Sequence, residues 1–257
     1  MVKGLYTAYT GMINEQNRMD VLTHNLANAD TTGYKKEGAT SQSFDSVLAY
    51  KIKDTTDVAR GRKIGKMSLG VKVGETYTDF SEGSMRQTDN TYDLALTDSG
   101  FFTVEFTNKA GQTSIKYTRD GSFTATQEGY LVTKDGDYVL DNGGRHIQVD
   151  PLAEVTIDRN GNIYQNGSAV AALGIADFED YNYLEHYGEN YYQPLEGATM
   201  KQAQGQVLQG YLEMANMQVV SEMVQLISVT RQYESNQKII QTIDGSLEIA
   251  ANQLGKV

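Results

Sequence analysis

The sequence has no cysteine, no tryptophan and only two prolines in 257 residues. The absence of cysteine excludes disulfide bonds, thiolate nucleophiles and cysteine-ligated zinc. The sequence also contains no apolar run near the roughly 20 residues that a membrane-spanning helix needs. The N-terminus, MVKGLYTAYTGM, lacks the apolar core of a cleaved signal peptide. We therefore expect a soluble or assembled protein without direct membrane insertion.

Basic residues are also few. The chain carries 33 acidic and 22 basic residues, which gives a net charge of −11. Because nucleic-acid binding requires a concentrated positive surface, nucleic acid is not an expected partner. The length is sufficient for one large domain or two of ordinary size. The 25 glycines and the scarcity of proline favour tight β-turns and long uninterrupted helices.

Apolar residues recur with heptad spacing near the N-terminus. The repeating positions are Leu5, Met12, Met19 and Leu26, with Ala8 and Leu22 in the alternating slot. Glu15 interrupts that slot once. A stripe of this period is typical of a coiled-coil seam, which is narrower than the apolar face of a globular helix.

A longer heptad stripe lies at the C-terminus. Its first seam position comprises Val219, Leu226, Tyr233, Ile240, Leu247 and Leu254, and its second comprises Met223, Thr230, Gln237, Asp244 and Ala251. A helix of this span would be on the order of 55 Å long, which exceeds the diameter of a small domain. We therefore expect the two terminal helices to pair with each other and with other copies of the chain. The alternative is a single intramolecular antiparallel pair that packs on the intervening domain.

The middle of the chain has a different pattern. Short β-branched and aromatic runs such as FFTVEF, YLVT and EVTI alternate with Asp-Gly and Asn-Gly turns. These dipeptides supply the positive φ that tight hairpin turns need. The sequence therefore predicts an α+β protein, in which discontinuous terminal helices flank an inserted antiparallel all-β domain. The expected divisions are a helical domain of residues 1–30 plus 215–257, a connecting segment 31–72 and a β-rich domain 73–214.

No motif in the sequence specifies a catalytic or metal site. His24, His146 and His186 do not share a metal-ligand spacing, and GRKIGKM at 61–67 lacks one of the four residues that a phosphate loop places between its glycines. We expect a protein that is not an enzyme and has no cofactor or metal. Two alternatives stay open. One is a hydrolase with a carboxylate pair, and the other is an envelope adhesin or binding module that uses the tyrosine-rich acidic segment 177–196.

Three stretches together resemble a known family. They are GLYTAYTGM with NRMDVLTHNLANADTTGYKK, then DLALTDSGFFTVEF with YTRDGSFTATQEGYLVTKDGDYVL, and finally LQGYLEMANMQVVSEMVQLISVTRQYESNQKIIQTIDGSLE. They are similar, in the same order, to the flagellar hook-basal body protein family, specifically the rod subunits of the bacterial basal body. The distal rod type is favoured, with a proximal rod relative as the alternative.

The resemblance implies a structural role in the basal body within the cell envelope. Such a subunit would polymerise helically through its terminal helices into a drive shaft that transmits torque from motor to hook. Its partners would be other copies of itself, neighbouring rod and hook subunits, and the flagellar export apparatus, which passes it without a cleaved signal peptide.

The Asn-rich segment HNLANADTTGYKK follows the first heptad stripe. Asn25 and Asn28 are suited to end the helix, and Gly33 adopts left-handed conformations freely. Together with Tyr34 and Lys35, these residues are expected to form a contact segment; the alternative is an ordinary helix cap followed by a flexible loop. The expected assembly interface thus comprises these five residues, the heptad residues Leu5, Met12, Met19, Leu22 and Leu26, and the C-terminal residues Val219, Met223, Leu226, Tyr233, Ile240, Leu247 and Leu254.

Overall fold

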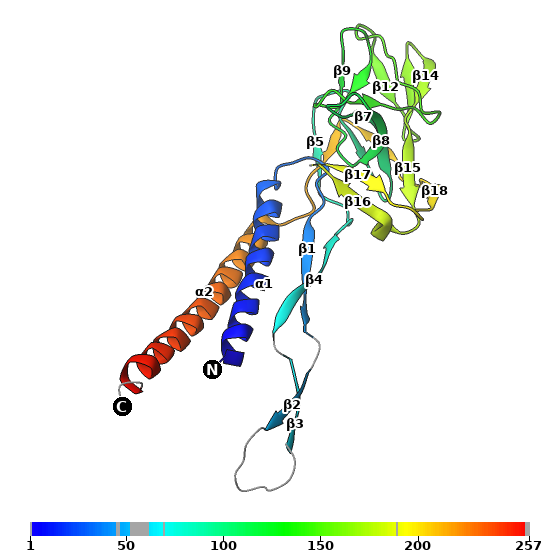
Figure 1. Cartoon of the computed structure of the whole chain (residues 1–257). Helices are drawn as coiled ribbons and strands as arrows, with labels where there is room; N and C mark the ends of the chain where they lie inside the picture. The colour runs from blue at the N-terminus through cyan, green and yellow to red at the C-terminus, as the bar shows by residue number, and fades with distance from the viewer. Residues whose placement is uncertain (1, 45–46, 52–61, 69, 189, 255–257) are drawn as a thin grey trace. The chain divides into compact units, whose positions relative to one another are not determined.

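A long helix lies at each end of the chain, and antiparallel β-structure lies between them in the computed structural model (Figure 1). This confirms the predicted α+β class. The structure describes residues 2–44, 47–51, 62–68, 70–188 and 190–254. The chain divides into two compact units. Unit 1 comprises Met1–Leu26, Glu37–Thr78 and Gln218–Val257, and unit 2 comprises Ala27–Lys36 and Asp79–Met217.

Unit 1 contains the two terminal helices. Helix α1 spans Val2–Ala27, and helix α2 spans Val219–Ile249 and continues into the short π-helix η2, Ala250–Leu254. The helices lie side by side and run in opposite directions (Figure 1). The hydroxyl of Thr230 lies 3.8 Å from the sulfur of Met19.

Two glycines on α1 determine how closely the helices approach. A Cβ atom added to Gly4 would lie 3.7 Å from Ile243, and one added to Gly11 would lie 3.0 Å from the amide nitrogen of Asn236. Because positions 4 and 11 are one heptad apart, both glycines lie on the same face of α1. The missing side chains leave room for α2. Because Gly4 faces Ile243 and Gly11 faces Asn236, the two helices are antiparallel.

The remainder of unit 1 is a two-stranded ribbon. Strand β1 (Glu37–Ser43) pairs with β4 (Val71–Thr78), and β2 (Val47–Lys51) pairs with β3 (Arg62–Met67), both antiparallel. The side chain of Asn25 joins this ribbon to the end of α1. Its amide donates to the carbonyl of Glu37 at 2.8 Å and accepts from the backbone N–H of Glu37 at 2.9 Å.

Unit 2 contains the other strands. They are β5 (Met85–Gln87), β6 (Leu94–Leu96), β7 (Phe101–Thr107), β8 (Thr113–Thr118), β9 (Thr124–Ala125), β10 (Leu131–Val132), β11 (Tyr138–Val139), β12 (Val155–Ile157), β13 (Asn162–Gln165), β14 (Ser168–Ala172), β15 (Ile175–Phe178), β16 (Leu184–Tyr187), β17 (Tyr191–Pro194), β18 (Met200–Gln202), β19 (Val207–Gln209) and β20 (Tyr211–Glu213), with a 3-10 turn η1 at Tyr181–Tyr183. A nine-stranded sheet runs β16-β17-β8-β7-β11-β10-β9, and β15 joins β7 to β18. The smaller sheets are β12-β13-β14, β19-β6 and β20-β5.

Strand β7 separates two hydrophobic clusters. Successive side chains of a strand point to opposite faces, so Phe101 and Phe102 enter different clusters. Phe102 packs with Leu94, Val104 and Phe123 in the larger core, while Phe101 packs with an aromatic group that comprises Tyr117, Phe178 and Tyr192. One predicted hairpin turn is found at Asn166-Gly167. Asn166 and Gly167 have φ values of 50° and 77° and join β13 to β14, as a tight hairpin turn requires.

The boundaries of the units differ from those expected from the sequence. The expected connecting segment 31–72 is divided between the units, because residues 31–36 belong to unit 2 and the chain from Glu37 belongs to unit 1. The physical reason is that the residues before and after Lys36 make different kinds of contact. The residues before it are buried among the strands of unit 2, and the residues after it form a β-ladder.

Candidate functional site

The two helices of unit 1 bury one face against each other. On α1 the heptad residue Ala8 is buried, and the other apolar seam positions are half-buried: Leu5, Met12, Met19, Leu22 and Leu26. On α2 the seam residues Leu226, Tyr233 and Ile240 are half-buried. The predicted first seam of each helix therefore faces the interior of unit 1 along much of its length.

The second seam position of α2 lies one residue earlier than predicted. Met223 and Asp244 are exposed, whereas Glu222 and Val229 are buried, and Ile243 is half-buried against Gly4. The structure thus buries the series 222, 229, 236 and 243 more deeply than 223, 237 and 244, while Thr230 of the predicted series is half-buried against Met19. Each series contains polar residues, but the buried one places Ile243 and Asn236 against Gly4 and Gly11 of α1, where the missing side chains leave room for them.

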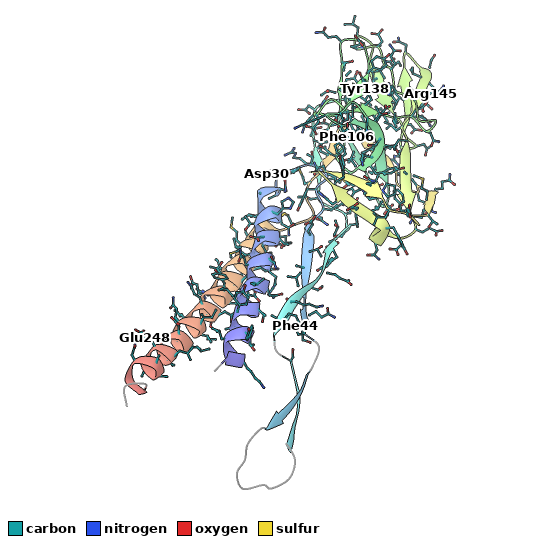
Figure 2. All side chains as sticks on the ribbon, in the orientation of Figure 1. Asp30, Phe44, Phe106, Tyr138, Arg145 and Glu248 are labelled. Atoms are coloured by element: carbon teal, nitrogen blue, oxygen red, sulfur yellow. The ribbon has the colours of Figure 1, made fainter. Side chains whose placement is uncertain are left out.

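Apolar side chains of α2 remain exposed after this pairing. Val220, Val224 and Ile227 are 75%, 62% and 54% exposed. Their spacing of i, i+4 and i+7 places them on one face, which we call the α2 stripe. A shallow groove of about 380 Å³ lies along it and is lined by Val224, Ile227, Ser228, Arg231, Gln232 and Ser235. Side chains project from α2 on the side away from α1 (Figure 2).

The N-terminal helix also carries an exposed apolar face. Tyr6, Tyr9 and Ile13 are exposed at a spacing of i, i+3 and i+7, and we call them the α1 stripe. Three residues of the predicted interface on α2, Val219, Met223 and Leu247, are exposed as well. The side chain of the predicted residue Leu254 lies outside the described part of the chain. The helix pair therefore leaves apolar surface on both of its members.

Four residues of the expected interface lie inside this chain. Asn25 is buried where α1 meets β1, and Gly33, Tyr34 and Lys35 are buried in unit 2. Asn28 is half-buried. Asn25, Gly33, Tyr34 and Lys35 thus contact residues of their own unit, and their predicted contact with a neighbouring subunit stays a prediction.

The acidic segment 177–196 does not present its tyrosines as one surface. Tyr191 and Tyr192 are buried, and Tyr181 donates its hydroxyl to Asp177 at 2.8 Å. Asp177 is itself buried. Although burial raises the pKa of its carboxyl group, hydrogen bonds from Ser99, Tyr181 and neighbouring groups outweigh this effect and leave that pKa below its usual value. Tyr183 and Tyr187 are exposed, so the tyrosines of this segment are divided between the core and the surface of unit 2, which does not favour the adhesin alternative.

The described residues offer little to metal or membrane chemistry. Among them, no three histidine, aspartate or glutamate side chains are grouped so that they could hold a metal ion. Within the same part of the chain, no helix is both long and apolar enough to cross a membrane. The surfaces that stand out are the α1 stripe and the α2 stripe, which are suited to protein contacts.

Comparison with known proteins defines the class. Three family models match this chain: "Flagella basal body rod protein" over residues 5–35, "Flagellar hook protein FlgE/F/G D1 domain" over 95–165, and "Flagellar basal body rod FlgEFG protein C-terminal" over 208–254. The matches cover α1 and the chain after it, much of the β-structure, and α2. The class is that of the flagellar hook and rod proteins.

Relatives of full length narrow this class to one family. The flagellar basal-body rod protein FlgF of Caulobacter vibrioides is 32% identical over the whole of both chains. The flagellar hook-basal body complex protein FlhO of Bacillus subtilis is 31% identical, also over the whole of both chains. The rod protein FlgG of Buchnera aphidicola is 30% identical over 96% of this chain and 98% of its own. The chain belongs to the flagellar basal-body rod protein family, as the sequence predicted. These similar identities do not select one subunit type, so the distal type stays a prediction.

Proposed function

We propose that this protein is a structural subunit of the flagellar rod that polymerises helically through its terminal helices and transmits torque from motor to hook. Its partners are other copies of itself, neighbouring rod and hook subunits, and the flagellar export apparatus. The observation that carries this proposal is the apolar surface left on α1 and α2 after the two helices have paired.

The two stripes suggest how copies meet. The α2 stripe and the α1 stripe lie on different helices, so a head-to-tail contact is possible in which the α2 stripe of one copy meets the α1 stripe of the next and leaves its own α1 stripe open for a further copy. Such a contact is heterologous. A heterologous contact whose rotation does not close on itself generates a filament. The half-buried seam residues Leu5, Met12, Met19, Leu22 and Leu26 keep part of their surface for the same interface.

The energy of this contact is substantial. Burying one exposed valine or isoleucine side chain contributes about 1.5–3 kcal/mol. A charge buried without a partner opposes assembly by several kcal/mol more. The double substitution Val224→Glu, Ile227→Glu should therefore weaken polymerisation by roughly a hundredfold or more. It should leave the isolated subunit folded, because both side chains are already largely in solvent.

The experiment compares three forms of the full chain. The matched control, Gln225→Glu with Gln241→Glu, adds the same charge at exposed positions of the same helix. Circular dichroism reports the fold of each monomer, sedimentation reports polymer, and swimming of a strain without its own copy reports function. Loss of polymer and motility in the stripe variant alone is expected. Normal polymer from a folded stripe variant would show that assembly uses another surface.

A further inference from the structure

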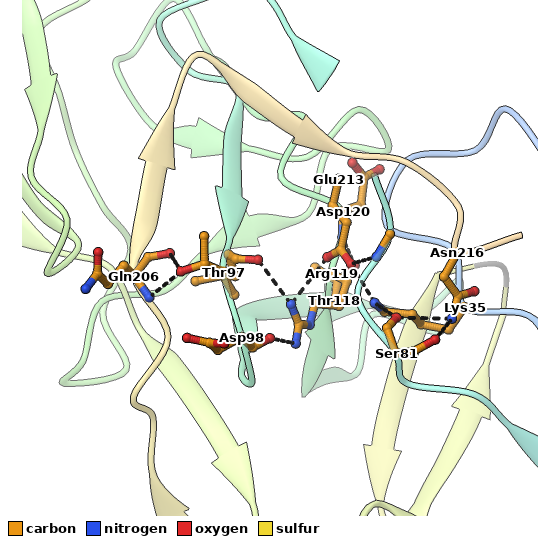
Figure 3. A network of polar contacts seen from close by, with 12 residues as sticks. Lys35, Ser81, Thr97, Asp98, Thr118, Arg119, Asp120, Gln206, Glu213 and Asn216 are labelled. Carbon is orange, nitrogen blue, oxygen red and sulfur yellow. Dashed lines mark hydrogen bonds and ion pairs between the residues drawn. The ribbon is translucent and has the colours of Figure 1, made fainter. Parts of the chain in front are cut away.

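Three charged side chains are buried together in unit 2. The Nζ of Lys35 lies 2.6 Å from Oε1 of Glu213, and a guanidinium nitrogen of Arg119 lies 3.3 Å from Oε2 of the same carboxylate. The side chains of Lys35, Arg119 and Glu213 are 1%, 3% and 0% exposed (Figure 3). Buried charges are tolerated only when they are paired and hydrogen-bonded. We call these three residues the ion cluster.

The ion cluster joins segments that are distant in the sequence. Glu213 also accepts the backbone N–H of Gly83 at 2.9 Å, and Lys35 donates to the carbonyl of Ser81 at 2.7 Å. Arg119 donates to the carbonyl of Asp98 at 2.6 Å. The carboxylate of Glu213 therefore lies where the segments around positions 35, 82, 119 and 213 meet. Removing it would leave two buried cations facing each other.

Residues 27–36, which we call the strap, are held by this arrangement. In the described structure the strap forms no strand, yet Thr32, Gly33, Tyr34 and Lys35 are all buried. The N–H of Gly33 donates to the carbonyl of Glu213 at 2.8 Å. The hydroxyl of Thr32 donates to Asp120 at 2.7 Å.

A second polar residue completes the attachment. The side chain of Asn216 accepts the N–H of Lys36 at 2.8 Å and donates to the carbonyl of Asp79 at 2.7 Å. The chain passes between the units after positions 26, 36, 78 and 217. Lys36, Asp79 and Asn216 lie within two residues of three of these crossings, and the strap begins at the fourth. Asn216 and its hydrogen-bond partners thus lie beside three of the four crossings, and the ion cluster holds the C-terminal end of the strap.

We propose that the ion cluster fastens the strap into unit 2, and that the strap detaches as one piece when the ion cluster is broken. This role is distinct from the proposed function, because it concerns the isolated subunit and needs no second copy. Glu213 is central to it, because its carboxylate pairs with both Lys35 and Arg119.

Amide hydrogen exchange of the full-length protein tests this proposal. The amides of Gly33 and Lys36 should exchange through local detachment of the strap, which exposes little surface. Their free energy of opening should therefore fall less steeply with urea concentration than that of amides in β7 and β8. In Lys35→Met the strap amides should exchange about a hundredfold faster or more, because one partner of a buried ion pair is lost. The β7 and β8 amides should remain protected.

The neighbouring lysine provides the matched control. Lys36 Nζ lies 3.4 Å from Asp79, and about a third of each side chain is exposed. Lys36→Met should therefore change exchange by no more than a few-fold. Strap and core amides of the unmodified protein that open together, with the same urea dependence, would overturn the proposal. So would unchanged strap exchange in Lys35→Met. The first result needs no variant, so it decides even if Lys35→Met does not fold.

Discussion

The pairing of α1 with α2 makes a quantitative prediction about two valines on the same helix. Val229 is 2% exposed and belongs to the buried seam, whereas Val224 is 62% exposed on the α2 stripe. Truncation to alanine removes the same two carbon atoms at both sites and raises helix propensity equally. The difference between the variants therefore isolates burial in the helix pair.

The expected magnitude follows from burial. Each buried methylene group contributes about 0.8 kcal/mol, and the cavity that remains adds to the loss, so Val229→Ala should lower the free energy of unfolding by about 2 kcal/mol. Val224→Ala should change it by no more than about 0.5 kcal/mol, because its side chain already meets solvent.

Urea unfolding of the dilute monomer, followed by the helical signal in circular dichroism, measures both changes. Equal midpoints for the two variants would contradict the seam through Val229 and Ile243. A larger loss for Val224→Ala would reverse the assignment of buried and exposed faces. Met223→Ala offers an internal check, since the seam predicted from the sequence would make it costly and its observed exposure makes it nearly neutral.

Other parts of the chain yield further predictions. Gly33→Ala should destabilise unit 2 by about 2 kcal/mol or more in urea unfolding. The reason is that φ of Gly33 is +69° and the new Cβ would lie 2.3 Å from the backbone nitrogen of Asp120. A neutral effect would contradict the close packing of the strap in unit 2. The lowered pKa of Asp177 means that its contribution to stability is fully present above the unfolded pKa near 4 and is lost as the pH falls through the folded pKa. Acid unfolding of Asp177→Asn should therefore show a weaker pH dependence below pH 4 than the unmodified protein, and identical slopes would refute this. Burial and Asp177 raise the pKa of Tyr181 to about 12, so this phenol stabilises the fold below pH 10 and loses that contribution as the pH rises toward 12. In an ultraviolet titration, Tyr181→Phe should show one late-ionising tyrosine fewer than the unmodified protein.

The terminal helices and the β-class followed from local patterns. A heptad period identifies a helix seam without tertiary information, and Asn-Gly dipeptides such as Asn166-Gly167 specify their own backbone conformation. The sequence did not predict which face of α2 is buried. Two possible seams share Leu226 and Tyr233, and they differ only in whether their second series begins at position 222 or at position 223. The positions of Gly4 and Gly11 on the opposite helix decide between them, and that requires the pairing itself.

The candidate interaction surfaces were predicted in part. Val220, Val224 and Ile227 already show helical spacing in the sequence, so a search for a second apolar face on α2 would have found the α2 stripe. The burial of Tyr34 and Lys35 had no comparable signal. Lys35 meets Glu213 across 178 positions of the sequence, and no local pattern specifies a contact of that separation.

The ion cluster shows the same limit. Arg119 and Glu213 belong to different strands or turns, and each looks like an ordinary surface charge in its own segment. Only the fold shows that both are buried, and that the carboxylate of Glu213 pairs with Arg119 and with Lys35 of the strap. Pairing between charged residues that are distant in the sequence therefore could not be predicted from the sequence alone.

Contact between the α1 stripe and the α2 stripe of different copies is most directly tested by disulfide cross-linking. Because the chain has no cysteine, Tyr9→Cys and Val224→Cys can be placed in separate copies and mixed. Assembly of the mixture under mild oxidation should give a covalent dimer that contains one copy of each variant, while the control pair Tyr9→Cys and Gln241→Cys should not. Polymer that forms normally but yields no such dimer would contradict the assembly of this protein through its exposed helix faces.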